Sequence, residues 1–341
     1  MIRICFLSSI LLTGLAGAQS SSTSLFIPDN SPTTGNLEFV PMGQARTSTN
    51  WTNQKYQTLI PGRLANTIRI NDLGFAPSTT NLHRFESITI KMDILPSTTT
   101  VLDPTFSNNL TSNAVTVLDA RDYVWHLEKD KWNRIGLQRD FFWSPKQGNL
   151  LIEIEVRGAG ALVGSTGGFR ASTTIERLYA AGWTTQPPAK GNTVPSLAAL
   201  KIELVSTDAD TMPLGQGCAG SNGTPALSFS GTSQLGKTLT VHLDNALANS
   251  AAAHILGSSN AAPLFPIDLG AAGAPGCSLY VALDVLFPVS TGTGSSQSPI
   301  QIPIDTTFVG KRLWNQFFVL DKNANNFGLV ASNYGRILIG T

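Results

Sequence analysis

Hydrophobic and polar residues alternate along much of this 341-residue chain. Ile88, Ile90 and Met92 fall on one side of an extended backbone, and the polar residues between them fall on the other. The same alternation recurs at 150–157 and 239–244. A period of two is typical of a β-strand with one buried face. The pattern therefore predicts half-buried strands at these three places.

Shorter apolar segments predict further strands near residues 56–60, 66–71, 114–118, 122–127, 200–205, 278–283 and 313–321. Residues 174–181 read equally well as a short helix or a strand, and strong helix signals are missing. Clusters of Gly, Pro, Asn and Ser separate the segments, as in proteins built from many short strands. We therefore expect an all-β fold of two tandem antiparallel β-sandwich domains of jelly-roll type.

Residues 1–18 have the pattern of a secretory signal peptide. Arg3 precedes an apolar run at 4–15, and small residues at 16–18 provide a cleavage site before Gln19. The run is shorter than the roughly 20 residues that cross a bilayer, and no later segment is long and apolar enough to do so. We therefore expect a protein without a membrane span that is secreted and extracellular or at the cell surface.

After removal of this peptide, the chain is longer than one hydrophobic core usually organises, which predicts two domains. A segment of Asp, Ala, Thr, Met and Pro at 208–213 separates two strand-rich parts. We expect an N-terminal β-sandwich domain at 24–207, a linker at 208–213, and a C-terminal β-sandwich domain at 214–341.

The composition limits the kinds of partner. Charged residues make up 13% of the chain, well below the usual share, and the net charge is +1. This balance provides no electrostatic attraction to nucleic acid or to an anionic membrane. Hydrophobic residues make up 42%, which is enough for packed cores. We therefore expect no nucleic-acid partner.

Only two cysteines, Cys218 and Cys277, follow the signal peptide. An even number of cysteines in an exported protein indicates a disulfide. A bridge would close a loop of roughly 60 residues, worth about 4 kcal/mol in the chain-entropy model. The alternatives are two free thiols or a two-thiolate metal site, although no CxxC spacing or nearby His supports a metal. We expect the disulfide.

Groups for catalysis are sparse. The four histidines are His83, His126, His242 and His254. His126 and His242 lie on polar strand faces, each two residues before a carboxylate, but no GxSxG nucleophile motif accompanies them. Glu153 and Glu155 share one strand face, which reads as a solvent face rather than a hydrolase pair. We therefore expect solvated strand histidines, no catalytic residue and no enzyme activity.

One segment has a weak resemblance to a calcium loop. Asp321, Asn323 and Asn325 provide oxygen atoms at alternating positions. An EF-hand needs glycine and glutamate where this chain has Asn326 and Ser332. A plain turn between two strands is the simpler interpretation. We therefore expect no metal site and no cofactor.

Five aromatic residues fall close together, namely Trp125, Trp132, Phe141, Phe142 and Trp143. Most of them read as core residues. Trp125 alternates in phase with other apolar positions, and at least one of Phe141 and Phe142 has to point inward.

Exposed tryptophan rings on a β-sandwich can also stack on sugars. Trp132 and Trp143 lie next to turns, which favours exposure of their rings. Arg134 and Arg139 are nearby cations that would bond sugar hydroxyls. These four residues are the candidate glycan-binding site.

The second half of the chain carries the motifs GCAGSNGTP at 217–225, GAPGCSLY at 273–280, VLDKNAN at 319–325 and GLVASN at 328–333. Together they resemble a C-terminal module of secreted proteins from planctomycete-type bacteria, over nearly all of 214–341. The resemblance implies export, paired cysteines and β-sandwiches, and it implies no activity. Lys322 and Asn323 stand where the usual pattern has Pro-Gly, so that turn is expected to differ.

The first half carries three weaker sequence similarities, at YQTLI (56–60), TFSNN (105–109) and NLLIEI (149–154). They resemble a β-sandwich module of the same kind of secreted protein. This weaker resemblance implies the same fold class for the N-terminal part.

These features favour a secreted, non-catalytic surface or extracellular-matrix protein with a scaffold or adhesion role. Its partners would be cell-surface glycans or other surface proteins. The first alternative is a glycan-binding module that uses exposed Trp in the N-terminal domain. The second is a secreted hydrolase of unknown type.

Overall fold

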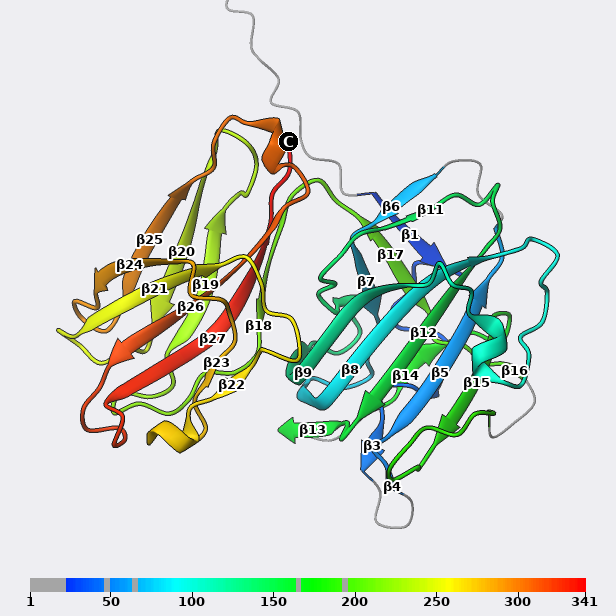
Figure 1. Ribbon diagram of the computed structural model, residues 1–341, viewed down its shortest axis with the longest axis horizontal. Helices are drawn as coiled ribbons and strands as arrows, with labels where there is room; N and C mark the ends of the chain where they lie inside the picture. The colour runs from blue at the N-terminus through cyan, green and yellow to red at the C-terminus, as the bar shows by residue number, and fades with distance from the viewer. Residues whose placement is uncertain (1–22, 46–49, 63–66, 164–166, 192–195) are drawn as a thin grey trace, which may run out of the picture.

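The computed structural model describes residues 23–45, 50–62, 67–163, 167–191 and 196–341. Regular structure in these residues is almost entirely β-strand, so the expected all-β class is confirmed. Strands β1–β17 and strands β18–β27 form two groups of sheets that lie side by side (Figure 1). We call these groups the N-terminal region and the C-terminal region. The expected signal peptide at 1–18 lies outside the described residues.

The strands of the N-terminal region are β1 (Thr23–Ile27), β2 (Asn36–Glu38), β3 (Gln44–Ala45), β4 (Asn50–Trp51), β5 (Gln54–Ile60), β6 (Ile68–Ile70), β7 (Asp72–Phe75), β8 (Asn81–Leu95), β9 (Val115–Leu127), β10 (Asn133–Arg134), β11 (Phe141–Trp143), β12 (Asn149–Arg157), β13 (Gly160–Val163), β14 (Phe169–Ala171), β15 (Glu176–Ala181), β16 (Ser196–Leu197) and β17 (Ile202–Ser206). A seven-stranded antiparallel sheet has the order β13-β8-β12-β5-β15-β16, with β9 paired to β8. A four-stranded sheet has the order β1-β17-β7-β10. The ambiguous segment at 174–181 is thus mostly strand.

The alternation in β8 places its apolar face inside the protein. Ile88, Ile90 and Met92 are fully buried and share one core with Tyr56 of the same sheet and Leu204 of the four-stranded sheet. Burial of apolar surface is the main favourable contribution to folding. The two sheets are therefore held together by the side chains that the sequence pattern identifies.

The opposite face of the seven-stranded sheet is also covered. The 3₁₀ turn η1 (Phe106–Asn109) packs on it next to Leu151. Glu153, expected on a solvent face, is only 3% exposed. Its carboxylate accepts a hydrogen bond from Gln57 Nε2 at 2.7 Å and lies 3.5 Å from Lys55 Nζ. The solvent-face expectation is wrong for Glu153, because a loop from elsewhere in the sequence covers it, whereas Glu155 on the same face stays partly exposed.

The strands of the C-terminal region are β18 (Asp210–Leu214), β19 (Ala226–Gly231), β20 (Thr238–Asp244), β21 (Ala251–Gly257), β22 (Ile267–Asp268), β23 (Ser278–Leu279), β24 (Val285–Ser290), β25 (Ser296–Gln301), β26 (Arg312–Leu320) and β27 (Leu329–Leu338), with the 3₁₀ turns η2 (Gly270–Ala272) and η3 (Thr306–Phe308). A five-stranded sheet has the order β18-β27-β26-β21-β24, and a three-stranded sheet has the order β19-β20-β25. Val241, Phe317 and Val330 belong to the core between them.

The segment at 208–213, expected to be a linker, is largely a strand. β18 pairs with β27 from Asp210 to Leu214. The segment contains Pro213 and little apolar alternation, so its sequence gives no strand signal. The chain therefore passes from one region to the other within residues 207–209.

A shared hydrophobic core joins the two regions. Trp314, Tyr280 and Tyr334 of the C-terminal region belong to the same buried cluster as Ile135 and Leu137 of the N-terminal region. The rings of Tyr280 and Tyr334 stack with their centroids 4.8 Å apart. Domains move relative to each other unless their interface is large and hydrophobic. The apolar packing at this interface therefore opposes relative movement of the two regions.

Buried charges cross the same interface. Arg336 is fully buried, and its Nη2 lies 2.8 Å from Asp72 Oδ2 and 2.8 Å from Asp210 Oδ2. Its Nη1 donates a hydrogen bond to Leu137 O at 3.1 Å. Asp72 Oδ1 also accepts a hydrogen bond from Gly136 N at 2.8 Å. One guanidinium of the C-terminal region is thus compensated partly by a carboxylate of the N-terminal region.

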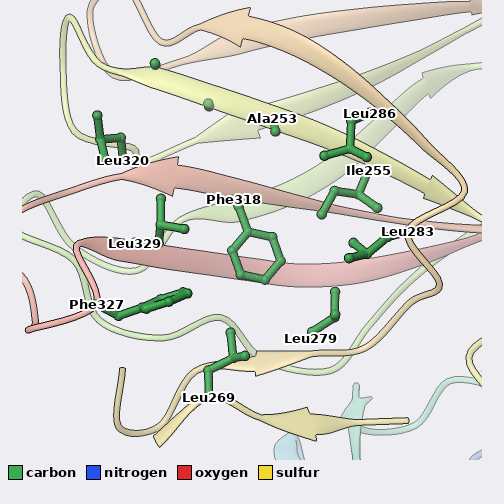
Figure 2. Close-up of a pocket in the computed structure, with 12 residues that line it drawn as sticks. Ala253, Ile255, Leu269, Leu279, Leu283, Leu286, Phe318, Leu320, Phe327 and Leu329 are labelled. Atoms are coloured by element: carbon green, nitrogen blue, oxygen red, sulfur yellow. The ribbon is translucent and has the colours of Figure 1, made fainter. Parts of the chain in front are cut away.

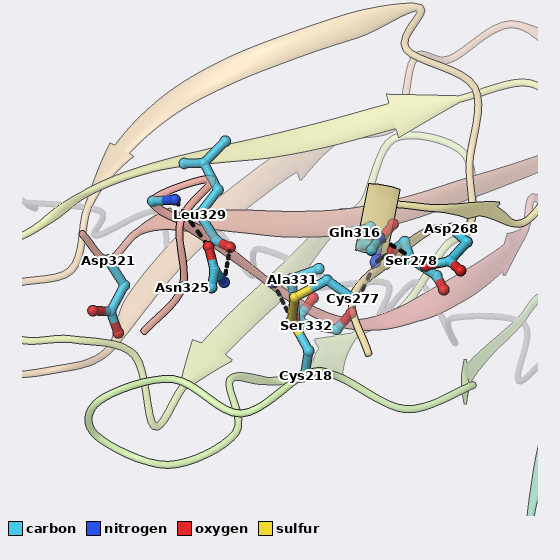
Figure 3. The surroundings of a disulfide bond; sticks show 12 residues. Cys218, Asp268, Cys277, Ser278, Gln316, Asp321, Asn325, Leu329, Ala331 and Ser332 are labelled. Atoms are coloured by element: carbon cyan, nitrogen blue, oxygen red, sulfur yellow. Dashed lines mark hydrogen bonds between the residues drawn. A yellow bond between two sulfur atoms is a disulfide. The ribbon is translucent and has the colours of Figure 1, made fainter. Parts of the chain in front are cut away.

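Cys218 and Cys277 form a disulfide, as expected (Figure 3). Gln316 holds the chain after Cys277, because its Nε2 donates to Ser278 O at 2.9 Å and its Oε1 accepts from Tyr280 N at 3.0 Å. The covalent bond and these hydrogen bonds fix this part of the chain across the outer face of the five-stranded sheet. A metal site at the two cysteines is excluded.

Candidate functional site

The aromatic cluster belongs mainly to the core. Trp125, Phe141 and Trp143 are buried, and Phe142 points outward with 62% exposure. Trp143 is only 1% exposed, and its Nε1 donates a hydrogen bond to Gly148 O at 3.0 Å. β11 pairs with β6, which places Trp143 in the core before the chain turns. The expectation that Trp143 lies exposed for a sugar is therefore wrong.

Trp132 is partly exposed, but Arg134, one of its two expected cationic neighbours, has another partner. Its ring centroid lies 5.2 Å from that of Phe26, and its Nε1 lies 3.4 Å from Asn30 O. Arg134 faces the C-terminal region, where its Nη1 lies 3.2 Å from Asp210 Oδ1. Trp132 and Arg134 therefore lie in different surroundings.

Asp321, Asn323 and Asn325 lie in the connection between β26 and β27. The carboxylate of Asp321 accepts hydrogen bonds from Ser221 N and Ser221 Oγ, each at 2.7 Å. Burial alone would raise the pKa of Asp321, but its hydrogen bonds outweigh this effect and lower it. Asn325 Oδ1 accepts from Gly328 N at 2.9 Å. These side-chain oxygens support a turn, which is the interpretation that the sequence favours.

Two histidines are buried, contrary to the expectation of solvated strand residues. His83 Nε2 lies 2.7 Å from Met42 O. His254 Nδ1 lies 2.8 Å from Ser298 Oγ, and its ring stacks on Phe317 with the centroids 4.6 Å apart. Burial lowers the pKa of each histidine to about 4. Both are therefore neutral core residues at pH 7.

The other two histidines bond groups other than the neighbouring carboxylates. His126 Nε2 lies 2.8 Å from Gly215 O, across the boundary between the regions. His242 Nε2 lies 2.6 Å from Ser230 Oγ on the neighbouring strand β19. These contacts are consistent with structural roles.

We expect the protein to lose stability in mild acid. An unfolded histidine binds a proton near pH 6.5, whereas folded His83 and His254 do so only near pH 4. Between these two values the unfolded state binds more protons than the folded state. The free energy of unfolding therefore decreases as the pH is lowered from about 6.5 to about 4, by about 3 kcal/mol per histidine. Urea denaturation across this interval measures the slope. His254→Gln should reduce it, and an unchanged slope would contradict the assignment.

A polar cleft lies where the two regions meet. Its volume is about 540 Å³. The residues that give it its chemistry are Asp119, Gln138 and Arg139 from the N-terminal region and Ser259, Asn260 and Trp314 from the C-terminal region. Asp119 lies on β9, Trp314 lies on β26, and Asn260 follows β21. Clefts of this size between domains are common binding sites for small molecules.

Gln138 and Asn260 hold the two sides of the cleft together. Gln138 Oε1 accepts a hydrogen bond from Asp119 N at 2.9 Å, and its Nε2 donates to Asn260 Oδ1 at 3.1 Å. Ala262 N also donates to Asp119 O at 3.5 Å. Trp314 borders the cleft but packs mainly in the shared core. The shape of the cleft is thus set by contacts within the protein.

Two opposite charges face the cleft. The side chains of Asp119 and Arg139 are exposed, and neither has a hydrogen bond or an ion pair among the residues that the structure describes. Both groups are therefore available to a ligand. The two charges sum to zero, so the cleft has no net charge that would favour an anion over a cation.

This set of side chains matches the chemistry of a sugar. The carboxylate of Asp119 accepts hydrogen bonds from hydroxyl groups, and the guanidinium of Arg139 donates them. Trp314, which is buried in the shared core, contributes an apolar part of the wall. Hydrolysis of a glycosidic bond usually needs two carboxyl groups, and Asp119 is the one carboxylate among the residues that line the cleft.

Arg139 is a candidate binding residue from the sequence, but as a neighbour of Trp132 and Trp143 rather than of this cleft. Asp119, Asn260 and Trp314 were missed. Gln138 and its partner Asn260 are 122 residues apart, so no local pattern connects them. Trp314 lies in a predicted strand. Nothing in the sequence around it indicates that this strand faces the N-terminal region.

In the part of the chain that the structure describes, no helix is long and apolar enough to span a membrane. No group of three His, Cys, Asp or Glu side chains there is placed to hold a metal ion. The resemblance to secreted planctomycete-type proteins stays a prediction. No protein-family model matches the chain, and no curated protein matches it.

Proposed function

We propose that this protein is a non-catalytic extracellular scaffold or adhesion protein that binds a neutral glycan in the cleft between its two regions. The observation that carries the proposal is the pair of side chains Asp119 and Arg139. Both face one polar cleft beside Trp314, and within the described residues neither has a partner. A glycan on a cell surface or in a matrix is the kind of ligand that these groups would bind.

The disulfide supports the extracellular part of the proposal. The bond between Cys218 and Cys277 is of a kind that persists in oxidising compartments and is rare in the cytosol. The signal-peptide pattern at residues 1–18 agrees with this location.

The contacts between the regions support binding to a preformed site. Gln138 and Asn260 join the two walls, and the shared core keeps the regions in place. A ligand that enters does not have to order the protein, which reduces the free-energy cost of binding. A rigid cleft is therefore well suited to hold a weakly interacting sugar.

We expect Arg139→Ala to weaken binding of neutral oligosaccharides about tenfold, which corresponds to roughly 1.4 kcal/mol. The melting temperature should stay the same, because the guanidinium is exposed and has no partner in the described fold. Titration calorimetry with neutral gluco-, galacto- and manno-oligosaccharides measures binding, after an array screen selects the best ligand. Asp119→Asn should weaken binding as well, since it removes the charge.

Arg121→Ala is a matched control. Arg121 is exposed on the same strand as Asp119 but lies outside the residues that line the cleft. A further variant, Trp132→Ala, tests the site expected from sequence. Loss of binding in Trp132→Ala but not in Arg139→Ala would place the glycan in the N-terminal region. A wild-type protein that binds no oligosaccharide would overturn the glycan proposal.

A further inference from the structure

An apolar groove crosses the outer face of the five-stranded sheet in the C-terminal region (Figure 2). Its volume is about 510 Å³, and the twelve residues that line it are all Ala, Ile, Leu or Phe. Phe318 lies near its middle, with Leu286 on one side and Leu269 on the other (Figure 2). The groove is separate from the polar cleft in its residues and in its chemistry.

The groove arises because β26 is apolar on both faces. Phe317 and Val319 lie in the core between the sheets, whereas Phe318 and Leu320 line the groove. Ala253 on β21 adds only a methyl group, which leaves the space open. Strands with continuous apolar runs are typical of sheets that are covered on both faces. The residues of this outer face are therefore suited to being covered.

The N-terminal region covers only part of this face. Ile255 and Leu279 line the groove and also belong to the core that the two regions share. Leu283 and Leu286, which lie beside Ile255, remain exposed, and so does Phe327 at the other end of the groove (Figure 2). The groove is thus the uncovered continuation of an existing apolar interface.

We propose that the groove binds the hydrocarbon chain of a free fatty acid, with the carboxylate left in solvent. A polar molecule would lose hydrogen bonds to water here, because the lining side chains offer none in return. An alkyl chain has no such loss. Each additional CH₂ group that leaves water should strengthen binding about fourfold. Affinity should therefore rise steeply with chain length until the groove is full.

A second copy of this chain fits the groove less well. Protein interfaces usually involve about 20–30 residues on each side, and twelve line this groove. The adjacent edge strand β24 contains Pro288, which lacks an N–H and interrupts strand addition at the edge. These features favour a narrow occupant over another protein.

The test is titration calorimetry of the full mature chain with monomeric dodecanoate and octanoate. We expect one site that binds dodecanoate more tightly than octanoate. Leu286→Asn and Ala253→Leu should each weaken dodecanoate binding at least tenfold, the first by adding a polar group and the second by filling space. Leu286 is 55% exposed, so its replacement should leave the fold intact. Ile304→Asn is the control, because Ile304 is 89% exposed and lies outside the groove.

Absence of dodecanoate binding, or equal binding in all three variants, would overturn the proposal. So would binding to phosphatidylcholine vesicles without binding of free dodecanoate, which would indicate a membrane-facing surface. A dimer seen by light scattering that dissociates in Leu286→Asn, without chain binding, would assign the groove to a second copy. Arg139→Ala should keep full dodecanoate binding, since the proposal does not depend on the glycan cleft.

Discussion

Replacement of Arg336 by methionine should lower the free energy of unfolding by about 3–5 kcal/mol. The substitution keeps much of the side-chain volume but leaves the carboxylate of Asp72 buried without its cation. Asp210 loses the same partner but keeps its contact with Arg134. Chemical denaturation of the purified variant measures the loss, which should occur in both regions together because they share one core.

A double variant separates the lost charge from the lost packing. Arg336→Met combined with Asp72→Asn should be more stable than the sum of the single effects indicates, because no unpaired buried charge remains. Lys131→Ala is the exposed comparison, since its ion pair with Glu128 lies at the surface and should matter little. Wild-type stability in Arg336→Met would show that the buried charges do not hold the regions together.

Trp143→Ala should cost about 3–5 kcal/mol of stability, whereas Trp132→Ala should cost much less. Trp143 is enclosed by the core, and its ring nitrogen bonds Gly148 O. Trp132 is half-buried and packs mainly on Phe26. The same chemical change thus removes a core side chain in one variant and a surface ring in the other.

Scanning calorimetry of the two tryptophan variants gives the comparison directly. Equal losses in melting temperature would contradict the placement of the rings. A stable Trp143→Ala protein would also reopen the possibility that this ring contacts a ligand rather than the core.

The fold class was predictable because alternation depends only on neighbouring residues. Ile88, Ile90 and Met92 are buried together since a strand places every second side chain on one face. Contacts between distant segments have no such local signal. Glu153 is covered by the segment around η1, and β18 pairs with β27. In both cases the partner segment lies far away in the sequence.

The candidate sites were less predictable for the same reason. The cleft needs Asp119 and Trp314 from different regions, and neither residue is unusual within its own strand. The groove did leave a signal, because the run of apolar residues at 317–320 is too continuous for a half-buried strand. A strand is predicted there, and its second apolar face indicates that something covers it.

The hydrogen bond between Gln138 and Asn260 has a consequence for binding kinetics. Because the bond spans both walls of the cleft, the walls need not close around a ligand before it is held. Association should then be a single step, at about 10⁵–10⁷ M⁻¹ s⁻¹, without a slower phase from domain closure. Under the proposed function, differences in affinity between glycans should accordingly appear in how long each one stays bound, and this residence time would set how long an adhesive contact lasts.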